Sequence, residues 1–285
     1  MTKRYSINDL SLFSPWPARL LGIEEFSQKH KNRSEAIREF EEEKWGPLCR
    51  KIQEKSSATI LDVSEIFNGH AGILYYDHGV FKKGDAFIVH KKYIKMACDT
   101  ILSYINKKET IVEFGSGYGA IALSLAKKVR SKKIHIIAGE YTESGRSIIK
   151  TLAKKGNFDV VVGECDINSD SITEMAIPKN SVIYTSSTAY IIPFLPESFV
   201  KNILRFKPKI VIHIEPIYEH TNNGDLYSLL RKRYIEINEY NRNLLTLLKK
   251  AEEMGLIQIE RNDPIIFGDN PLFCYSIIAW RPVKR

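Results

Sequence analysis

A glycine-rich segment near the middle of the chain constrains the fold most strongly. The stretch Ile111–Gly119 reads IVEFGSGYG, so an apolar run carries an acidic residue, Glu113, and three glycines follow at alternate positions. Glycines at these positions let a buried strand turn sharply into a helix and let the backbone approach a ligand closely. Dinucleotide-binding loops have the spacing G-x-G-x-x-G, whereas this segment has G-x-G-x-G. The segment therefore predicts a nucleotide-cofactor loop whose ligand is not NAD.

The acidic residue and the glycine spacing resemble the first motif of the class I S-adenosylmethionine-dependent methyltransferases, which reads acidic-x-G-x-G-x-G. The four matching positions are Glu113, Gly115, Gly117 and Gly119. The resemblance covers roughly residues 70 to 285. It implies S-adenosylmethionine (SAM) as the cofactor, and it implies that the loop, with Ser116 inside it, binds this cofactor.

Two further apolar runs end in acidic residues where the resemblance expects them. Glu140 follows the run 134–138, and family enzymes use an acidic side chain there to bind both ribose hydroxyls. Asp166 follows the run 159–163, where relatives place an acidic or polar group near the adenine amino group. The remaining residues expected to contact the cofactor lie next to strand ends and are Tyr141, Thr142, Ile167 and Thr185.

From residue 110 onward, apolar strand-like runs alternate with helical segments. We expect strands at about 110–115, 134–140, 159–164, 181–186 and 209–215. The helices between them are expected near 118–129, 143–155 and 196–205. This alternation indicates an α/β fold, a doubly wound parallel sheet with helices on both faces. Two later runs, 256–260 and 272–280, resemble the family's closing hairpin, which implies a seven-stranded, mostly parallel sheet with an antiparallel last strand.

The two ends of the chain are expected to add helices around this sheet. Residues 1–65 lack strand alternation and predict a helical N-terminal cap, and residues 66–285 form the methyltransferase-like domain. The clearest helix of the cap is 33–45, whose apolar stripe is typical of a packing face. After the fifth strand we expect one long helix over 225–254, ended by Gly255. The cap and this helix would form a lid over the acceptor.

The segment before the glycine loop is dense in tyrosine and histidine. In the fold that the resemblance implies, such a segment commonly covers the methionine end of the cofactor. Tyrosines there can bond the cofactor's carboxylate or lie near its sulfonium. Tyr75, Tyr76 and His78 are therefore candidates for cofactor contact. The alternative is a hairpin or loop whose aromatic side chains pack on the core.

The end of the fifth strand, Ile212–His220, carries several acid–base groups. Acceptors in such folds lie at the carboxyl ends of strands, and transfer to a hydroxyl needs a group that removes its proton. His213 and Glu215 share one face of a strand and can act as a base with an orienting carboxylate, and Tyr218 is the third catalytic candidate. A metal site of His213, Glu215 and His220 is an alternative, but the irregular spacing favours hydrogen bonding, so no metal is predicted. The other alternative is a buried, hydrogen-bonded His213.

The fourth-strand end narrows the choice of acceptor. Residues 184–190 lack the Asn/Asp-Pro-Pro-aromatic sequence of adenine and glutamine amino-methyltransferases and the Pro-Cys of cytosine C5 enzymes. We predict transfer of a methyl group from SAM to a small molecule, at a hydroxyl oxygen of a sugar-like, nucleotide-linked or other secondary metabolite. The alternatives are an N-methyltransferase on a guanidino or amino group held by Glu215 and Glu219, an RNA or protein methyltransferase, and a SAM-binding module without transfer.

Charge and composition indicate which kinds of binding partner to expect. The chain has 285 residues and a net charge of +8, but its Lys and Arg are spread among acidic residues, so nucleic acid is not an expected partner. No apolar run approaches the roughly 20 residues that span a bilayer, and no signal sequence is recognisable. The four cysteines lack zinc spacing and suit reduced thiols. We expect a cytoplasmic enzyme without a membrane partner, for which a homodimer is one option.

Overall fold

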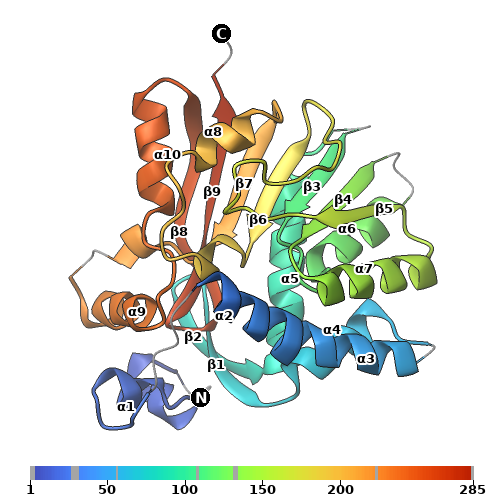
Figure 1. Ribbon diagram of the computed structural model, residues 1–285. Coiled ribbons are helices and arrows are strands. Elements are labelled where there is room, and N and C mark those ends of the chain that lie inside the picture. The colour runs from blue at the N-terminus through green and yellow to red at the C-terminus, as the bar shows by residue number, and fades with distance from the viewer. Residues whose placement is uncertain are drawn as a thin grey trace.

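The centre of the fold is a sheet of nine strands in the described part of the chain. The computed structural model describes residues 4–26, 32–55, 57–106, 109–130, 134–221 and 224–283. The strand order across the sheet is β2-β1-β8-β9-β7-β6-β3-β4-β5 (Figure 1). The strands are β1 Gly72–Asp77, β2 Val80–Asp85, β3 Thr110–Phe114, β4 His135–Glu140, β5 Val160–Glu164, β6 Val182–Ser186, β7 Ile210–Glu215, β8 Ile257–Asn270 and β9 Phe273–Pro282.

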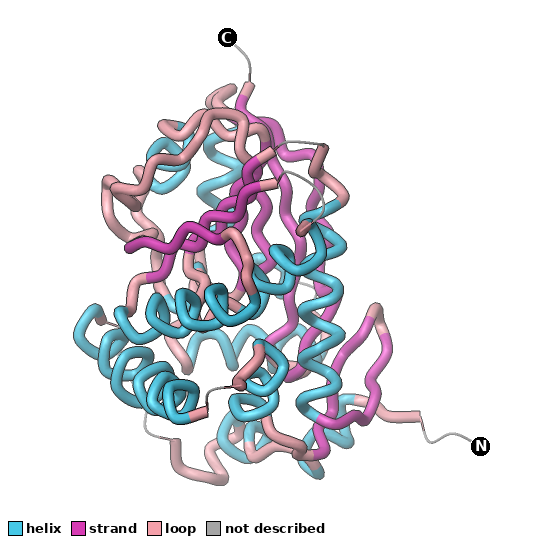
Figure 2. The backbone as a smooth tube through the Cα atoms, turned by 90° about the vertical axis from the view of Figure 1, so that its right-hand side faces the viewer, coloured by secondary structure: helices cyan, strands magenta, loops and turns pink. Residues whose placement is uncertain are grey.

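Helices lie on both sides of the strands (Figure 2). The α-helices are α1 Trp16–Leu20, α2 Arg33–Ile37, α3 Gly46–Glu54, α4 Ile60–Asn68, α5 Ala86–Leu102, α6 Ala120–Val129, α7 Glu143–Gly156, α8 Phe199–Leu204, α9 Leu226–Ile237 and α10 Leu244–Glu253. The shorter segments are the 3-10 turns η1 Ile7–Leu12, η3 Ala189–Ile191 and η4 Tyr218–Thr221, and the π-helical η2 Arg38–Trp45. α2, η2 and α3 follow one another without a break.

The middle of the sheet is a parallel core. β5, β4, β3, β6 and β7 are paired in parallel, with later strands on both sides of β3. In a doubly wound sheet the strand order reverses at such a point, and ligands bind outside the carboxyl ends of the strands there. The predicted α/β class, with helices on both faces, is confirmed. β9 pairs antiparallel with both of its neighbours, β7 and β8.

The expected count of seven strands is wrong because a hairpin extends one edge of the sheet. β1 and β2 pair around His78 and Gly79, whose φ angles of 47° and 87° suit a tight hairpin turn. β8 is longer than expected, and its outer part pairs with β1, where Tyr76 faces Gly268. The segment before the glycine loop therefore adopts the hairpin that the sequence left open as an alternative.

The single helix expected over 225–254 is also wrong, since the chain forms two helices, α9 and α10. Between them, Glu239 adopts a φ of 51°, which no helix continues through. The Asn241 side chain donates to the carbonyl of Ile192 at 2.8 Å and accepts from the backbone N–H of Leu244 at 2.9 Å, at the start of α10. Asparagine commonly bonds to backbone groups at helix ends. These local bonds outweigh the helical spacing of the apolar residues.

Alternation along the strands divides the interior into two hydrophobic cores. On β7, Ile212 and Ile214 belong to the core beneath α5, α6 and α7, whereas Val211 belongs to the core beneath α8 and α10. Successive side chains of a strand point to opposite faces. His213 therefore points toward α8 and α10, on the same side as Val211.

The N-terminal helices cover one end of the sheet. η2 and α3 contact α7, and α4 contacts α5 and α6. Figure 1 shows α2, α3 and α4 in blue next to the green α7. The boundary predicted at residue 65 falls inside α4. Residues 1–3, 27–31 and 56 of the predicted cap lie outside the described residues.

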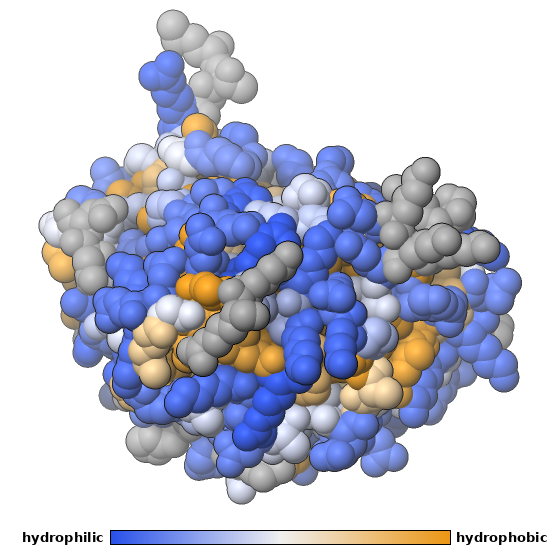
Figure 3. Space-filling model, turned by 90° about the horizontal axis from the view of Figure 1, so that it is seen from above, coloured by the Kyte–Doolittle hydropathy of each residue, from blue (hydrophilic) through white to orange (hydrophobic). Residues whose placement is uncertain are grey.

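The outer surface is polar over most of the face seen in Figure 3, where smaller hydrophobic areas lie between hydrophilic side chains. Scattered apolar side chains of this kind are ordinary on a globular protein. Among the described residues, each helix is too short or too polar to cross a lipid bilayer.

Candidate functional site

The glycine loop joins β3 to α6 in a conformation that requires glycine. Gly115, Gly117 and Gly119 have φ angles of 82°, 54° and 84°, which glycine adopts without strain. A Cβ atom on Gly115 would overlap the side chain of Thr188, and one on Gly117 would lie 3.1 Å from the ring of Trp45. The loop is therefore packed between the end of β6 and the N-terminal cap.

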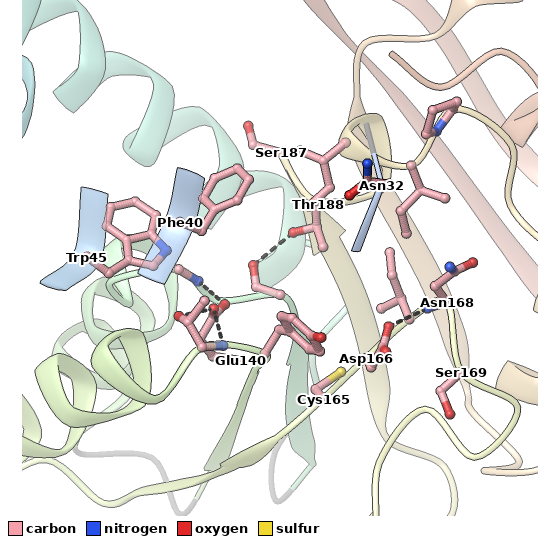
Figure 4. A pocket seen from close by; sticks show the side chains of 18 of the residues that line it. Asn32, Phe40, Trp45, Glu140, Cys165, Asp166, Asn168, Ser169, Ser187 and Thr188 are labelled. Carbon is pink, nitrogen blue, oxygen red and sulfur yellow. Dashed lines mark hydrogen bonds between the residues drawn. The ribbon is translucent and has the colours of Figure 1, made fainter. Parts of the chain in front are cut away.

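A cavity of about 570 Å³ lies beside the glycine loop at the carboxyl ends of the parallel strands. We call it the first cavity. Figure 4 shows Phe40 and Trp45 on one side of it and Asn168 and Ser169 on the other. The residues predicted for the cofactor that line it are Gly115, Gly117, Glu140, Tyr141, Thr142, Asp166 and Ile167. The strand ends predicted from the sequence are thus brought together around one space.

Glu140 ends β4 at the wall of the first cavity. Its carboxylate accepts hydrogen bonds from the Gly117 N–H at 2.7 Å, the Thr142 N–H at 2.9 Å and the Thr142 hydroxyl at 2.6 Å. Burial raises the pKa of this carboxyl, and the bonds from Thr142 and Gly117 act in the opposite direction. Glu140 thereby ties the glycine loop to the start of α7 next to the cavity, a position that fits the predicted binding of ribose hydroxyls.

The residues that come after β5 in the chain form another part of the wall of the first cavity. Asp166 and Ile167 lie there, and the backbone N–H of Asn168 donates to Oδ1 of Asp166 at 2.9 Å. Cys165 is buried in the same wall. An aliphatic side chain beside a carboxylate offers both a packing surface and a hydrogen-bond acceptor, which suits a planar base that carries an amino group.

Glu113 lies on β3 below the glycine loop, beside a second, smaller cavity. Its side chain is 2% exposed, and its Oε2 has no hydrogen-bond partner among the described residues. Burial raises the pKa of Glu113 to about 8. The hydroxyls of Tyr184 and Ser116 lie close to this carboxyl and act to lower its pKa. Glu113 and Ser116 thus place a buried polar group in the wall of the second cavity.

The second cavity has a volume of about 200 Å³. It shares walls with the first cavity, namely Phe40, Trp45, Gly115, Gly117 and Ser187. Its other aromatic walls are Phe67, Tyr93, Tyr118, Tyr190, Phe273 and Tyr275. Its ionisable side chains, tyrosines aside, are Lys44, His90, Glu113 and Asp269. Because the two cavities meet at the glycine loop, a ligand bound in one can contact a ligand bound in the other.

The three residues predicted at the methionine end of the cofactor lie elsewhere. Tyr75 is buried, and its hydroxyl accepts a hydrogen bond from a lysine of α5 at 2.8 Å. Tyr76 packs against aromatic rings of β2 and α9, and His78 sits in the hairpin turn. Among the described residues that line the two cavities, none of the three is present. His90 and Tyr93, later in the same segment and now on α5, line the second cavity instead.

His213 does not have the surroundings of a base. It is 0% exposed, its Nδ1 lies 2.9 Å from Oγ1 of Thr185, and its Nε2 accepts a hydrogen bond from the Trp280 indole N–H at 3.0 Å. Burial lowers the pKa of His213 to about 3, so the ring is neutral. Both ring nitrogens are occupied on the α8–α10 side of the sheet. This is the buried, hydrogen-bonded histidine left open above, and it removes Thr185 from the cavity as well.

Glu215, the last residue of β7, holds the segment after β6 in position. It is 0% exposed, and its carboxylate accepts hydrogen bonds from the backbone N–H groups of Thr188 at 3.0 Å and Ala189 at 3.1 Å. Burial raises the pKa of Glu215 to about 7. These bonds fix the segment that carries Ser187 and Thr188 into the wall of the first cavity.

The other acid–base candidates near β7 are engaged outside the cavities. The Tyr218 hydroxyl donates to Glu236 of α9 at 2.8 Å, and Nδ1 of His220 lies 2.8 Å from the hydroxyl of Ser276. In the described part of the chain, no group of three or more His, Cys, Asp or Glu side chains could hold a metal ion. The alternative metal site of His213, Glu215 and His220 is therefore not formed.

The predicted cap supplies two lining residues that the sequence did not single out. Phe40 and Trp45 line both cavities, yet in the sequence they belong to an apolar stripe typical of packing. They lie on the π-helical η2, and such segments frequently occur at functional sites. Glu41, also on η2, accepts the backbone N–H of Ser144 at 3.1 Å and so docks the cap on the first turn of α7. Two aromatic residues beside a glycine-rich loop cannot be recognised before the fold is known.

The two cavities together fit SAM. Glu140 offers a carboxylate for ribose hydroxyls, and Asp166 and Ile167 offer a polar and an aliphatic group for adenine. Gly115 and Gly117 of the glycine loop line both cavities. Glu113 offers a carboxyl oxygen with no partner in the described residues, which suits the ammonium group of the methionine part.

Some solved structures are similar to part of this chain. No protein-family model matches the chain, and no curated protein matches it. A SAM-dependent methyltransferase from Aquifex aeolicus is 18% identical, with 66% of this chain and 97% of that chain covered and a TM-score of 0.44. The cyclase SpnF is 14% identical, with 66% and 81% covered and a TM-score of 0.48. Geranyl diphosphate C-methyltransferase from Streptomyces coelicolor A3(2) is 12% identical, with 68% and 82% covered and a TM-score of 0.48. These are similarities of fold over about two-thirds of this chain, and the function is argued from the site itself.

Proposed function

We propose that this protein transfers a methyl group from SAM to a small-molecule acceptor. The observation that carries the proposal is the pair of buried carboxylates, Glu113 and Glu140, that flank the glycine loop and face two adjoining cavities. The first cavity would hold the nucleoside part of SAM. The second would receive the methionine end and the acceptor.

Each part of the chain has a distinct task in this proposal. SAM supplies a methyl carbon already activated by its sulfonium, so the protein mainly holds the reactants close together. Glu140 binds the ribose, Asp166 and Ile167 hold the adenine, and Glu113 binds the ammonium of the methionine part. Phe40 and Trp45 of the cap cover the site and limit the entry of water. We retain the N-terminal cap as a lid on the rest of the chain, with α4 Ile60–Asn68 spanning the boundary predicted at residue 65.

The choice of the atom that is methylated rests on the sequence rather than on the cavities. The sequence favours a hydroxyl oxygen of a sugar-like, nucleotide-linked or other secondary metabolite, and that prediction relied on His213 as the base. With both nitrogens of His213 occupied, a hydroxyl acceptor needs another base. An RNA or protein acceptor is less suited to a cavity of about 200 Å³ with mostly aromatic walls.

The test is calorimetric titration of the protein with SAM and with its demethylated product, S-adenosylhomocysteine. We expect micromolar binding of both ligands to a single site. Thermal unfolding in the same buffers shows that the protein is folded. A folded protein that binds neither ligand would contradict the proposal. Binding of SAM without turnover of any acceptor would favour the alternative of a SAM-binding module.

A further inference from the structure

The second cavity contains a carboxylate that no cation of the described chain neutralises. Asp269 lies near the end of β8, and its Oδ1 accepts the backbone N–H of its neighbour Asn270 at 3.0 Å. Among the described residues, no Lys, Arg or His forms an ion pair with it. Burial raises the pKa of Asp269, because the ionised form is poorly solvated there. A carboxylate kept in such surroundings is costly unless a ligand compensates its charge.

Aromatic rings surround Asp269. Tyr93 stacks on Tyr275 with ring centroids 4.4 Å apart, and Tyr190 meets Phe273 edge to face at 4.8 Å. All four rings line the same cavity as Asp269. Faces of aromatic rings attract organic cations, and the attraction grows when water is excluded.

The hydroxyls of two of these rings are already bonded. Tyr93 lies 2.5 Å from the hydroxyl of Ser186 and 3.1 Å from that of Ser187, which in turn donates to Tyr275 at 3.0 Å. These bonds hold the rings in place. They leave the ring faces and the carboxylate of Asp269 as the means of recognising a ligand.

The remaining charges of the second cavity do not favour an anion. Glu113 is a second acid, and burial lowers the pKa of His90 to about 4, so this histidine is neutral. The one lysine among the described lining residues, Lys44, pairs with Glu39 at 2.7 Å and lies 4.2 Å from the centroid of Phe40. A phosphorylated or carboxylated acceptor would find no cation among the described lining residues except the already paired Lys44.

We propose that the acceptor is a small organic amine, bound as its ammonium between Asp269 and the aromatic walls of the second cavity. This inference rests on the proposed function. The ammonium gives one proton to the Asp269 carboxylate, which leaves a lone pair on nitrogen. That lone pair forms the bond to the methyl carbon as the carbon–sulfur bond of SAM breaks and its electrons remain on sulfur. The products are S-adenosylhomocysteine and the methylated ammonium, with Asp269 protonated.

The test compares amines with neutral molecules of the same shape. Protein saturated with S-adenosylhomocysteine is titrated with phenethylamine and with 2-phenylethanol, and then with tryptamine and tryptophol. The same titrations use Asp269→Asn, which keeps the shape of the side chain and an oxygen for the Asn270 N–H. Glu260→Gln is the matched control, since it neutralises an exposed carboxylate of the same strand that pairs with Arg281.

We expect at least one amine to bind the unmodified protein about tenfold or more tightly than its alcohol, as a desolvated cation–π contact with a carboxylate would give. Asp269→Asn should remove that preference, and Glu260→Gln should keep it. Equal or tighter binding of the alcohols, no binding of any of the four, or a preference that survives Asp269→Asn would overturn the proposal.

Two further binding measurements distinguish failure of this inference from failure of the proposed function. Failure of S-adenosylhomocysteine to bind would count against the cofactor, whereas its binding without amine preference would count only against the acceptor class. The ratio of SAM to S-adenosylhomocysteine affinity tests a different partner for Asp269. If Asp269→Asn weakens SAM alone, the carboxylate neutralises the sulfonium, and the amine proposal is wrong.

Discussion

Two pairs of buried acid–base residues lie on strands of the same parallel core, and they differ in what surrounds them. Glu113 and Glu140, on β3 and β4, face the two cavities beside the glycine loop. His213 and Glu215, on β7, are 0% exposed and bonded to their own neighbours. In the sequence both pairs look alike, as polar residues in or after an apolar run.

The difference teaches that contact with a cavity, rather than burial or hydrogen bonding, distinguishes a candidate binding group from a structural one. Glu113 keeps an oxygen without a partner in the described chain, and Glu140 holds its donors along a cavity wall. Both ring nitrogens of His213 are hydrogen-bonded to side chains, and the carboxylate of Glu215 accepts hydrogen bonds from the backbone after β6. The first pair can therefore meet a ligand in a cavity, whereas the second pair contacts only the folded chain.

Among the variants that test this comparison, His213→Ala should have the largest effect on stability. It removes a buried ring and leaves the Trp280 N–H and the Thr185 hydroxyl without their partner. We expect a loss of about 3 kcal/mol in the free energy of unfolding, from the cavity and the unpaired donor. SAM affinity, measured by calorimetry below the unfolding temperature, should remain within about twofold, a change of less than 0.5 kcal/mol. A variant of normal stability that has lost turnover would restore His213 as the base.

Glu140→Ala should act on the cofactor instead. Losing a carboxylate that bonds to ribose hydroxyls should weaken SAM binding by about 2 kcal/mol, or about 30-fold in Kd. The matched control is Glu164→Ala, because Glu164 is exposed at the end of β5 and is the register partner of Glu140. Calorimetric titration of both variants checks the prediction. Equal SAM affinity in the two would mean that Glu140 serves only the glycine loop.

Glu113→Gln should change how stability depends on pH. Burial raises the folded-state pKa of Glu113 from 4.5 to about 8, so between these values the folded protein binds more protons than the unfolded chain. Stability from this group is therefore present at low pH and lost as pH rises toward 8. Glu215, whose pKa is raised to about 7, contributes a decline that ends earlier.

Between pH 5 and pH 8 we expect the Tm of Glu113→Gln to fall less than the Tm of the unmodified protein, by at least about 5 °C. The decline due to Glu215 should remain in the variant. Identical pH profiles would mean that the Glu113 carboxyl is solvated or neutralised in the folded protein.

The parallel core could be predicted because its signals are local. Apolar runs, glycine spacing and helix periodicity all lie within short segments of the chain. The hairpin of β1 and β2 and the division of the 225–254 helix depend on distant contacts. β1 joins the sheet through β8, and Asn241 bonds to Ile192. Neither contact can be predicted from the residues that are adjacent in the sequence.

The candidate site could be predicted only where one segment carries the information. The glycine loop, Glu140 and Asp166 follow their strands directly, so their meeting at one edge of the sheet follows from parallel pairing. Asp269 and Trp45 come from the two ends of the chain and meet that edge through tertiary packing. The face on which His213 lies depends on the strand register, and shifting a strand by one residue exchanges its two faces.

Tyr218→Phe should have the smallest effect on stability, and it tests whether the residues near the end of β7 take part in catalysis. Burial raises the pKa of Tyr218 to about 12, so the hydroxyl is neutral and donates to Glu236 at 2.8 Å. Removing this half-buried bond should cost less than about 1 kcal/mol of unfolding free energy. Because the ring lies outside both cavities, SAM affinity and amine binding should not change. If Tyr218 is catalytic, turnover of an acceptor found in the amine and alcohol titrations would fall at least tenfold while stability stayed constant. That result would place the acceptor beside β7 rather than beside Asp269.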